Sequence, residues 1–308
     1  MSVLNCLKPA GDTIVFYAPG SRHYDNGLFV NNRGSFVNIS VTGTACQCKC
    51  EHCNGRLLDA MLAVDSPHSL RRMAYELVSQ GCRGVLISGG ACRQGEVPLA
   101  GYGPALLAMK TMGLSVVVHP GLLTAAIAAE LAQAGVERVA LDLIGDADTI
   151  SRVYHLRKTP DDYRRSLALA REAGLKVSPH IVVGLHFGEI KGEYEALDMV
   201  AQAGADSLVL VVLTPLPGTN MAGVQPPAES AVIAFFKTAR RLLPNLPLAL
   251  GCARPAGQYA RRIERAAVEL GFKAIAYPAR ETVEYAVSRG LSVSYREVCC
   301  GLLIDGKA

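Results

Sequence analysis

Several features are missing from the sequence, and most of these absences narrow its class. The 308 residues include no tryptophan, which by itself decides nothing. No apolar run reaches about 18 residues, the length at which a helix can cross a bilayer, so we expect no membrane partner. No apolar stretch follows a basic start, as it does in a secretory signal. We therefore expect a cytoplasmic protein.

Concentrated positive charge is also missing. The net charge is +4, and the 31 Lys and Arg residues are scattered without interleaved aromatic residues. Surfaces that bind nucleic acid gather such residues on one face, so we expect no nucleic-acid partner. No internal repeat, low-complexity tract or linker is evident, and half of the residues are apolar. One main domain with a large core is the simplest interpretation.

Cysteine, in contrast, is abundant. A reducing compartment keeps thiols free, so clustered thiols usually indicate metal binding or catalysis. The ten cysteines are Cys6, Cys46, Cys48, Cys50, Cys53, Cys82, Cys92, Cys252, Cys299 and Cys300. Four of them lie within eight consecutive residues, and this cysteine-rich stretch is the strongest signal in the chain.

Cys46, Cys50 and Cys53 have a C-x3-C-x2-C spacing. One short loop with this spacing can bind three irons of a four-iron cluster and leave the fourth iron without a protein ligand. A zinc knuckle usually takes its ligands from two separated pairs, and no later C-x2-C or H-x3-H pair occurs. A disulfide is a further alternative, but nothing indicates secretion. We predict a cluster on these three thiols, with Cys48 a bystander.

From Phe36 onward, short apolar runs rich in β-branched residues alternate with segments of helical periodicity. The predicted strands are Phe36–Val41, Gly84–Ser88, Leu114–His119, Arg138–Leu143, Lys176–Val183, Ser207–Leu213, Leu246–Gly251 and Lys273–Ala276. The predicted helices are Pro67–Gln80, Gly103–Thr111, Thr124–Ala134, Pro160–Ala173, Glu189–Ala203, Ala228–Leu243, Gln258–Leu270 and Thr282–Arg289.

Eight such pairs predict an α/β fold with a parallel (β/α)8 TIM-type barrel over residues 36–290. Residues 1–35 are interpreted as a lead-in segment packed on one end of the barrel. Residues 291–308 are interpreted as a C-terminal tail that carries candidate auxiliary-cluster ligands. In such a barrel the ligand site lies at the C-terminal ends of the strands. The residues that follow each strand are therefore the candidates for function.

Polar and small residues follow several of these strands. Ser88, Gly89 and Gly90 follow the second predicted strand, where two glycines allow the backbone to approach a ligand; a tight turn is the alternative. His119 ends the third strand and could orient a loop or touch substrate. Asp142 lies in the fourth strand, and a buried carboxylate needs a hydrogen-bond partner. That partner could be a ribose or a neighbouring His or Arg.

A second group of thiols follows later elements. Cys252 comes directly after the seventh predicted strand, and Cys299 and Cys300 stand near the end of the chain. Vicinal thiols cannot easily bind one iron together, but either could join Cys252 across the barrel mouth. We predict a second, auxiliary iron–sulfur cluster there, with unreactive core thiols as the alternative. The roles of Cys6 and Cys92 stay open.

The cysteine loop, with His52 in the aromatic-type position before the third cysteine, resembles the signature of the radical S-adenosylmethionine (radical SAM) superfamily. Ser88-Gly89-Gly90 resembles the glycine-rich second-strand motif of that family, with Ala91 where an acidic residue often stands. The resemblance implies a 4Fe-4S cluster and S-adenosyl-L-methionine as cofactors. It also implies that a glycine-loop carbonyl accepts the amino group of S-adenosylmethionine.

The segment from Ser178 to Glu189 resembles the part of the family's fifth strand that packs on adenine. His180 and Phe187 occupy positions where the family usually has Gly and an acidic residue. The resemblance therefore implies cofactor contacts at His180 and Val182 mainly through the apolar backbone. No catalytic residue is assigned.

Ile39–Gly43, Gly251–Pro255 and the Cys299-Cys300 pair resemble a biotin synthase-like branch, and in particular one component of the two-component (archaeal-type) lipoyl synthases. That resemblance implies insertion of sulfur into unactivated C–H bonds of an octanoyl chain on a lysine of a lipoyl carrier domain. It also implies a second radical SAM subunit and a low-potential reductant such as ferredoxin. The predicted activity is that of a radical SAM sulfurtransferase.

Two related enzymes do not match. Biotin synthase has extra cluster ligands on its middle strands, where this chain has His119, Asp142 and Ser178. A single-chain lipoyl synthase would have an N-terminal C-x4-C-x5-C run, which residues 1–35 lack. Two other functions stay open: a single-cluster radical SAM enzyme that cleaves or rearranges a small metabolite, and a non-catalytic iron–sulfur partner subunit.

Overall fold

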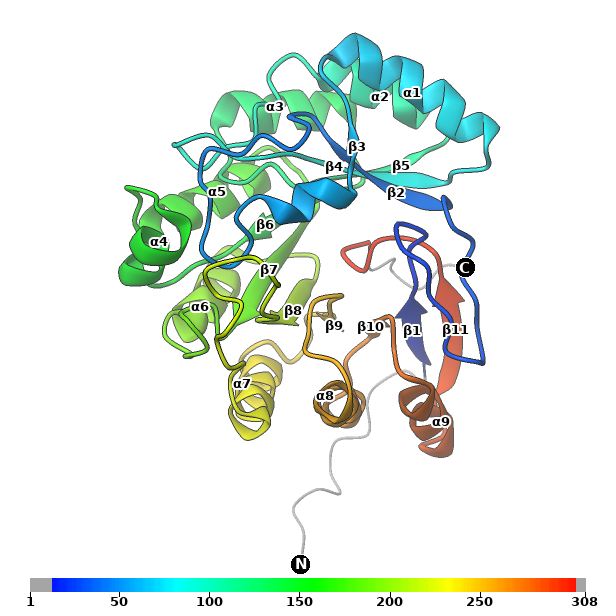
Figure 1. The fold of residues 1–308 in the computed structure, drawn as a ribbon, viewed down its shortest axis with the longest axis vertical. Helices are drawn as coiled ribbons and strands as arrows, with labels where there is room; N and C mark the ends of the chain where they lie inside the picture. Colours follow the sequence, from blue (N-terminus) through cyan, green and yellow to red (C-terminus); the bar gives the residue numbers. More distant parts are fainter. Residues whose placement is uncertain (1–12, 303–308) are drawn as a thin grey trace, which may run out of the picture.

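The central sheet of the computed structural model, which describes residues 13–302, is parallel and has the strand order β11-β1-β10-β9-β8-β7-β6-β5-β4-β2-β3. It curls around an interior, and the helices lie on its outer face (Figure 1). Within the described residues its end strands, β11 and β3, do not pair with each other. The predicted α/β class and TIM-type architecture are confirmed, as a barrel that is open between these two strands.

All eight predicted strand–helix pairs are present. The strands are β1 (Thr13–Tyr17), β2 (Phe36–Ser40), β3 (Leu62–Ala63), β4 (Gly84–Ser88), β5 (Ser115–Val118), β6 (Arg138–Asp142), β7 (Val177–Val183), β8 (Leu208–Val212), β9 (Leu248–Leu250), β10 (Ala274–Ala276) and β11 (Ser292–Arg296). The helices are α1 (Pro67–Ser79), α2 (Gly103–Thr111), α3 (Ala125–Ala134), α4 (Ala147–Tyr154), α5 (Pro160–Glu172), α6 (Glu193–Ala203), α7 (Glu229–Leu242), α8 (Gln258–Glu269) and α9 (Arg280–Ser288), with a 3-10 turn η2 (Arg56–Ala60).

Local sequence explains where several elements form. Every residue of β8 is buried, because a parallel strand is covered by helices on one face and by the barrel interior on the other. The α1 helix starts with Pro67 after Ser66, whose hydroxyl accepts the N–H of Ser69 at 3.2 Å. This N-terminal cap satisfies a backbone donor that the helix leaves free.

Two strands lie where a lead-in and a tail were expected. β1 pairs in parallel with β10 and β11, with Val15 opposite Ala274 and Ser294. The segment 13–17 therefore belongs to the sheet and does not only pack on one end of it. The βα alternation missed both strands because no helix follows either of them. The short helix α4 and the turn η2 were not predicted either.

The chain after β11 turns into the barrel interior. Leu302 is buried against Phe36, Val117 and Ala140. The Ser178 hydroxyl donates to the carbonyl of Gly301 at 2.7 Å, and the Tyr17 hydroxyl donates to the carbonyl of Leu302 at 3.1 Å. These contacts place Cys299 and Cys300 inside the barrel. Cys6, also considered from the sequence, lies outside the described residues.

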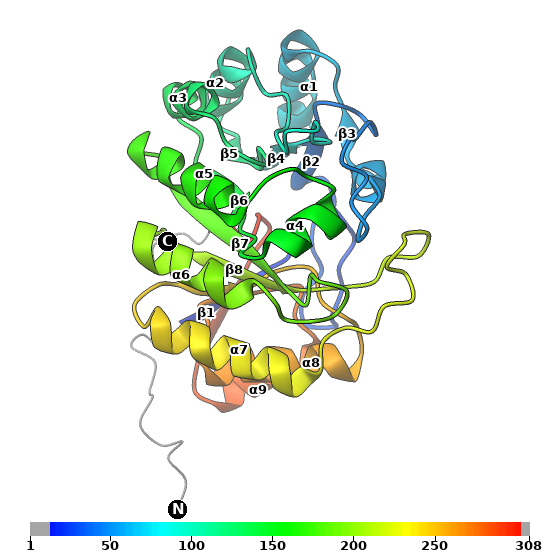
Figure 2. The ribbon, with the colours of Figure 1, turned by 90° about the vertical axis from the view of Figure 1, so that its left-hand side faces the viewer.

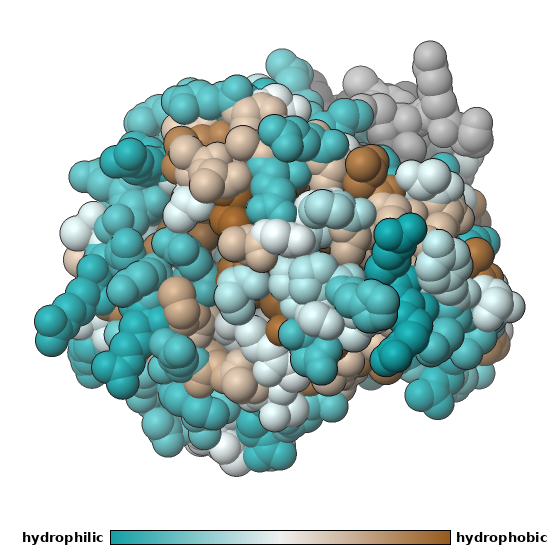
Figure 3. Space-filling view, turned by 90° about the horizontal axis from the view of Figure 1, so that it is seen from above, coloured by the Kyte–Doolittle hydropathy of each residue, from teal (hydrophilic) through white to brown (hydrophobic). Residues whose placement is uncertain are grey.

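The outer layer consists of neighbouring helices. Figure 2 shows α5, α6 and α7 side by side along one flank. Figure 3 shows mainly hydrophilic side chains on the face above α1 and α2, with apolar groups scattered between them. Within residues 13–302, no helix combines the length and the apolar character needed to span a membrane.

Candidate functional site

The cysteine-rich loop, residues 41–55, follows β2 at the C-terminal end of the barrel and is held on one side by the loop after β4. The Thr42 hydroxyl accepts the N–H of Gly90 at 2.7 Å and donates to the carbonyl of Ala45 at 2.9 Å. The Gln47 N–H donates to the carbonyl of Ala91 at 3.0 Å. The two predicted motifs, cysteine loop and glycine loop, therefore lie against each other.

Gly90 allows this close approach. A methyl group on Gly90 would overlap the carbonyl oxygen of Ala45 and would lie 2.6 Å from the Cα of Cys46. At Gly89 a methyl group would meet its nearest atom, the Thr42 hydroxyl oxygen, at 3.1 Å. Steric exclusion is thus stronger at Gly90, as expected where two backbones come close.

Helix α4 holds the other side of the cysteine loop. The Glu51 N–H donates to the carbonyl of Val153 at 2.9 Å. The ring of His155, at the end of α4, lies 2.9 Å from the Cys48 carbonyl through Nδ1 and 2.8 Å from the Glu51 carboxylate through Nε2. The sequence did not predict this bridge, because it depends on helix α4, which was not predicted either.

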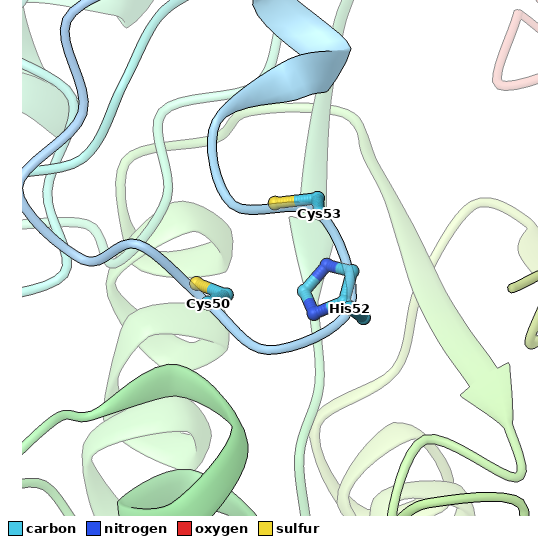
Figure 4. A group of neighbouring side chains, drawn as sticks. All are labelled: Cys50, His52 and Cys53. Carbon is cyan, nitrogen blue, oxygen red and sulfur yellow. The ribbon is translucent and has the colours of Figure 1, made fainter. Parts of the chain in front are cut away.

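Cys50, His52 and Cys53 form a group whose ligand atoms lie within 4.8 Å of one another. Figure 4 shows both sulfur atoms pointing to the same side, with the His52 ring beside the two cysteines. The hydrogen bond between the two thiols lowers the pKa of Cys53 and raises the pKa of Cys50. The two sulfurs are therefore close enough to share one proton, and a metal would bind them as thiolates.

The third predicted ligand, Cys46, does not belong to that group. Its sulfur lies 3.9 Å from the carbonyl of Ala91, on the side of the glycine loop. The thiol of Cys48 is buried and donates to the Cys92 carbonyl at 3.1 Å. The structure thus places Cys46, Cys50 and Cys53 on one loop, with Cys50 and Cys53 close together.

A polar group lies inside the barrel at the ends of β5, β6 and β7. His119 Nε2 lies 3.4 Å from Asp142 Oδ1, and the His119 and His180 rings are 6.0 Å apart. Burial alone would raise the pKa of Asp142, but the adjacent imidazoles outweigh it and lower the pKa to about 2. Of the partners considered for Asp142, the structure supplies a neighbouring histidine.

Val182 lines a small pocket at the ends of β6 and β7, together with Leu143, Gly145 and Leu185. This is the region that the sequence motif assigned to adenine. The loop after β7 is braced by Glu193, whose buried carboxylate accepts the N–H groups of Gly184 and Lys191, each at 2.7 Å. Glu193 was not predicted as a functional residue. The sequence predicted that this helix starts at Glu189, so Glu193 was placed inside the helix and not at its beginning.

The three remaining candidate thiols differ in exposure. Cys252 is exposed on the loop after β9, Cys299 is half-buried and Cys300 is buried. The thiols of Cys299 and Cys300 share a hydrogen bond, which lowers the pKa of Cys299. Within the described part of the chain, these three sulfurs do not form a group with all ligand atoms within 4.8 Å.

Another group with metal-binding side chains consists of Asp146, Asp148 and His186. Lys191 Nζ lies 2.6 Å from Asp148 and 3.7 Å from Asp146. Arg152 lies 3.5 Å from Asp148, so together the lysine and the arginine balance the charge of the two carboxylates. Asp146 also caps α4 through the Thr149 N–H at 2.7 Å, so the group has a structural explanation.

The comparisons agree with this arrangement of loops. The family model described as the radical SAM superfamily matches residues 40–200, which include both loops and Asp142. The chain belongs to the radical SAM superfamily. Its members use a 4Fe-4S cluster and S-adenosylmethionine. No curated protein matches the sequence, and the biotin synthase-like branch is a finer assignment that rests on the sequence motifs.

Solved structures support the same fold. Methylornithine synthase is 14% identical, with a TM-score of 0.60 over 85% of this chain and 83% of that protein. HydG from Carboxydothermus hydrogenoformans, a maturase of the FeFe-hydrogenase, is 15% identical, with a TM-score of 0.60 over 92% and 68%. Streptococcus suis SuiB bound to S-adenosylmethionine is 13% identical, with a TM-score of 0.55 over 73% and 51%. At these identities the likeness concerns the fold.

The residues present fit the family's two cofactors. Cys50 and Cys53 direct sulfur toward one side of the loop, and Cys46 lies on the same loop. Nδ1 of His52 is buried without a hydrogen-bond partner within the described residues, which fits a ligand beside it. The tight glycine loop adds backbone carbonyls near the cluster loop. Cys46, Cys50 and Cys53 would hold the cluster, and Ser88, Gly89 and Gly90 would face S-adenosylmethionine.

Proposed function

We propose that the protein is a radical SAM sulfurtransferase that inserts sulfur into an unactivated C–H bond. The proposed substrate is an octanoyl chain on a lysine of a lipoyl carrier domain. The observation that carries this proposal is the second set of cysteines on the barrel interior and rim, separate from the cluster loop. Cys299 and Cys300 are inside the barrel, and Cys252 lies on the rim.

The chemistry of the substrate supports a radical route. A methylene of an alkyl chain has no acidic proton and no electrophilic centre, so side-chain acids and bases cannot activate it. When bound, the cluster and S-adenosylmethionine supply a 5'-deoxyadenosyl radical, the electron coming from the external reductant. The substrate hydrogen would leave in 5'-deoxyadenosine. Cys252, Cys299 and Cys300 would hold the second cluster, which would supply both the sulfur of the new C–S bond and the acceptor of the remaining electron.

The chain's own residues position and enclose the reactants. Asp142, held by His119, lies at the mouth where a ribose would approach, and His180 and Val182 line the neighbouring strand. Apolar side chains such as Phe36 and Val117 close the interior behind them. An enclosed site keeps reactive species away from solvent, and holding reactants in place removes much of the entropic barrier.

The proposal includes partners. An octanoylated carrier domain is the substrate, a low-potential reductant such as ferredoxin supplies electrons, and a second radical SAM subunit shares the two C–S bond formations. Each bond formation consumes one S-adenosylmethionine and one sulfide. The proposal divides these two S-adenosylmethionine molecules and two sulfides between the two subunits.

Mass spectrometry of an octanoylated carrier peptide tests this proposal. The peptide is incubated anaerobically with the reduced protein and S-adenosylmethionine, alone and with candidate partner subunits. We expect 5'-deoxyadenosine together with a peptide that has gained sulfur. Formation of 5'-deoxyadenosine without sulfur in the peptide, in every combination, would overturn the assignment.

One observation favours a second candidate, a radical SAM enzyme with a single cluster that acts on a small metabolite. Cys252 is exposed, and the sulfurs of Cys252, Cys299 and Cys300 are not grouped at metal-binding distance. Iron content separates the two candidates. A reconstituted chain with about eight irons supports sulfur insertion, and one with about four irons supports the single-cluster enzyme.

A further inference from the structure

The ring of His180 has one nitrogen that no group of the described chain uses. Its Nδ1 lies 3.0 Å from the carbonyl oxygen of Ser178. Because a carbonyl oxygen only accepts hydrogen bonds, Nδ1 carries the proton of the neutral ring and Nε2 presents a lone pair. Within residues 13–302, no hydrogen bond reaches Nε2. Nε2 is also not one of the fully buried polar atoms that lack a partner, so open space reaches it.

The surroundings keep this ring neutral. Burial, and after it the positive charge of His119, lower the pKa of His180 to about 4. The two rings are 6.0 Å apart. His119 itself is engaged by the Asp142 carboxylate and by its own backbone. This wall of the barrel therefore holds two imidazoles in different states, and the one with an open acceptor is His180.

Strand β7 directs the His180 ring into the barrel interior. Alternate residues of a strand face the same side of the sheet. Ser178, two residues earlier, donates to the carbonyl of Gly301 in the interior. Val182, two residues later, lines the small pocket at the ends of β6 and β7. His180 therefore lies one step deeper in the barrel than the pocket that the sequence motif assigns to adenine.

Other polar side chains of this wall already have partners. The Ser178 hydroxyl lies 2.6 Å from the Ser207 hydroxyl and donates to Gly301, and the Ser88 hydroxyl donates to the carbonyl of His119 at 2.9 Å. A polar atom that loses water without gaining a partner weakens a complex. The alkyl part of a substrate would displace water from Nε2 and supply no hydrogen bond. A substrate that fills this space therefore needs an N–H or O–H group at that point.

We propose that Nε2 of His180 accepts a hydrogen bond from the amide N–H of the substrate. This inference rests on the proposed function, in which the substrate is an octanoyl-lysine. The amide N–H is the one hydrogen-bond donor along the octanoyl-lysine arm, so it is the group assigned to His180. An amide fixed at this point determines which carbons of the alkyl chain lie near the cofactor site. His180 is thus a specificity-determining residue.

The test compares two octanoylated carrier peptides that differ at one position. One carries the natural octanoyl-lysine amide, and the other carries an ester with an oxygen atom in place of the amide N–H. Binding is measured anaerobically on the reconstituted full chain with S-adenosylhomocysteine, so that no turnover occurs. We expect the wild-type chain to bind the amide at least about tenfold more tightly, because the ester oxygen brings a lone pair to a nitrogen that needs a donor.

Variants assign this preference to the imidazole. His180→Phe keeps a ring but removes the acceptor, so it should bind the two peptides with similar affinity. His180→Gln places a carbonyl oxygen near the position of Nε2 and should restore part of the preference. His68→Phe is the control, because His68 is exposed on α1, and it should keep the wild-type preference. Iron content and circular dichroism check the folding of each variant.

The outcomes separate the inference from the proposed function. Equal affinity of the wild-type chain for amide and ester, or a preference that survives in His180→Phe, overturns the role of His180 and leaves the proposed substrate in place. The wild-type comparison needs no variant, so it decides the matter even if His180→Phe does not fold. A wild-type chain that binds neither peptide overturns the octanoyl-lysine substrate, and the role of His180 with it.

Discussion

Two thiols on the cluster loop have almost the same burial but different predicted roles. Cys48 and Cys50 are 5% and 6% exposed, yet only Cys50 fits the three-ligand spacing. We expect Cys50→Ala to lose the iron of the first cluster and all formation of 5'-deoxyadenosine. Cys48→Ala should retain both, since Cys48 lies outside the three-ligand spacing and its thiol donates to the Cys92 carbonyl. Iron analysis and chromatography of the nucleoside product measure both effects.

The pair of variants controls for loop damage, because both remove a buried thiol from the same eight residues. Cleavage of S-adenosylmethionine by Cys50→Ala would contradict the ligand assignment. Loss of iron in Cys48→Ala would instead make Cys48 a ligand.

A second prediction at this scale concerns two glycines. Gly90→Ala places a methyl group against the carbonyl of Ala45 and 2.6 Å from the Cα of Cys46, so the cluster loop must move. We expect at least a tenfold loss of S-adenosylmethionine affinity and a reduced iron content. Gly223→Ala is the control, because its new methyl group would meet nothing within 4 Å. Equilibrium binding measured anaerobically compares them, and equal affinities would refute the steric argument.

Residues differ in how well the sequence predicts their role. The cysteine spacing is a local feature, so the cluster ligands could be predicted without knowledge of the fold. The sequence left the partner of Asp142 open between a ribose, a histidine and an arginine, because the choice depends on how β5 and β6 align. The His155 ring contacts Cys48 and Glu51, which lie 107 and 104 residues away in the sequence. Glu193 instead closes the loop just before its own helix. Neither set of contacts follows from hydrophobic periodicity.

At the scale of elements, a buried ion pair joins the Cys252 loop to the helices behind it. Arg254 and Glu264, whose side chains are 5% and 2% exposed, form an ion pair at 2.6 Å. Arg254 also donates to the carbonyls of Gly251, Ala276 and Tyr277. The pair thus ties the loop after β9 to the end of β10 and to α8.

We expect Glu264→Ala to lower the free energy of unfolding by about 3–5 kcal/mol, because it leaves a buried guanidinium without its counter-charge. Glu229→Ala is the matched control. It breaks the exposed pair of Glu229 with Arg262 at 2.9 Å, which should cost about 1 kcal/mol or less. Chemical denaturation followed by circular dichroism compares them. Similar losses in both variants would show that burial does not decide the effect.

The elements themselves were mostly predictable. Long apolar runs such as Leu208–Val212 alternate with amphipathic helices, and this pattern specifies parallel strands covered by helices. β1 and β11 were not predicted as strands, because no helix follows either of them. Only the assembled sheet shows that segments 279 residues apart in sequence, such as those of Val15 and Ser294, pair with each other.

At the scale of the whole molecule, the main feature is that the last described residues enter the barrel interior. The segment 298–302 fills the inside of the barrel, where Leu302 meets Phe36 and Gly301 meets Ser178. A tail that merely followed the barrel would leave Cys299 and Cys300 outside. Their position in the interior places a second set of thiols inside the barrel, apart from the cysteine-rich loop.

This arrangement predicts that the two sets of thiols act separately. The double variant Cys299→Ala, Cys300→Ala should keep the first cluster and still form 5'-deoxyadenosine, because the cluster loop has its own anchors on β4 and α4. Its iron content should fall from about eight to about four per chain, and sulfur-containing product should disappear. Cys82→Ala is the control, since that buried thiol contacts the Gly84 carbonyl at 3.3 Å, away from both sets. Unchanged iron and unchanged product in the double variant would show that the interior thiols hold no cluster. In that case the enzyme would have one radical-generating site, and the sulfur would have to come from elsewhere.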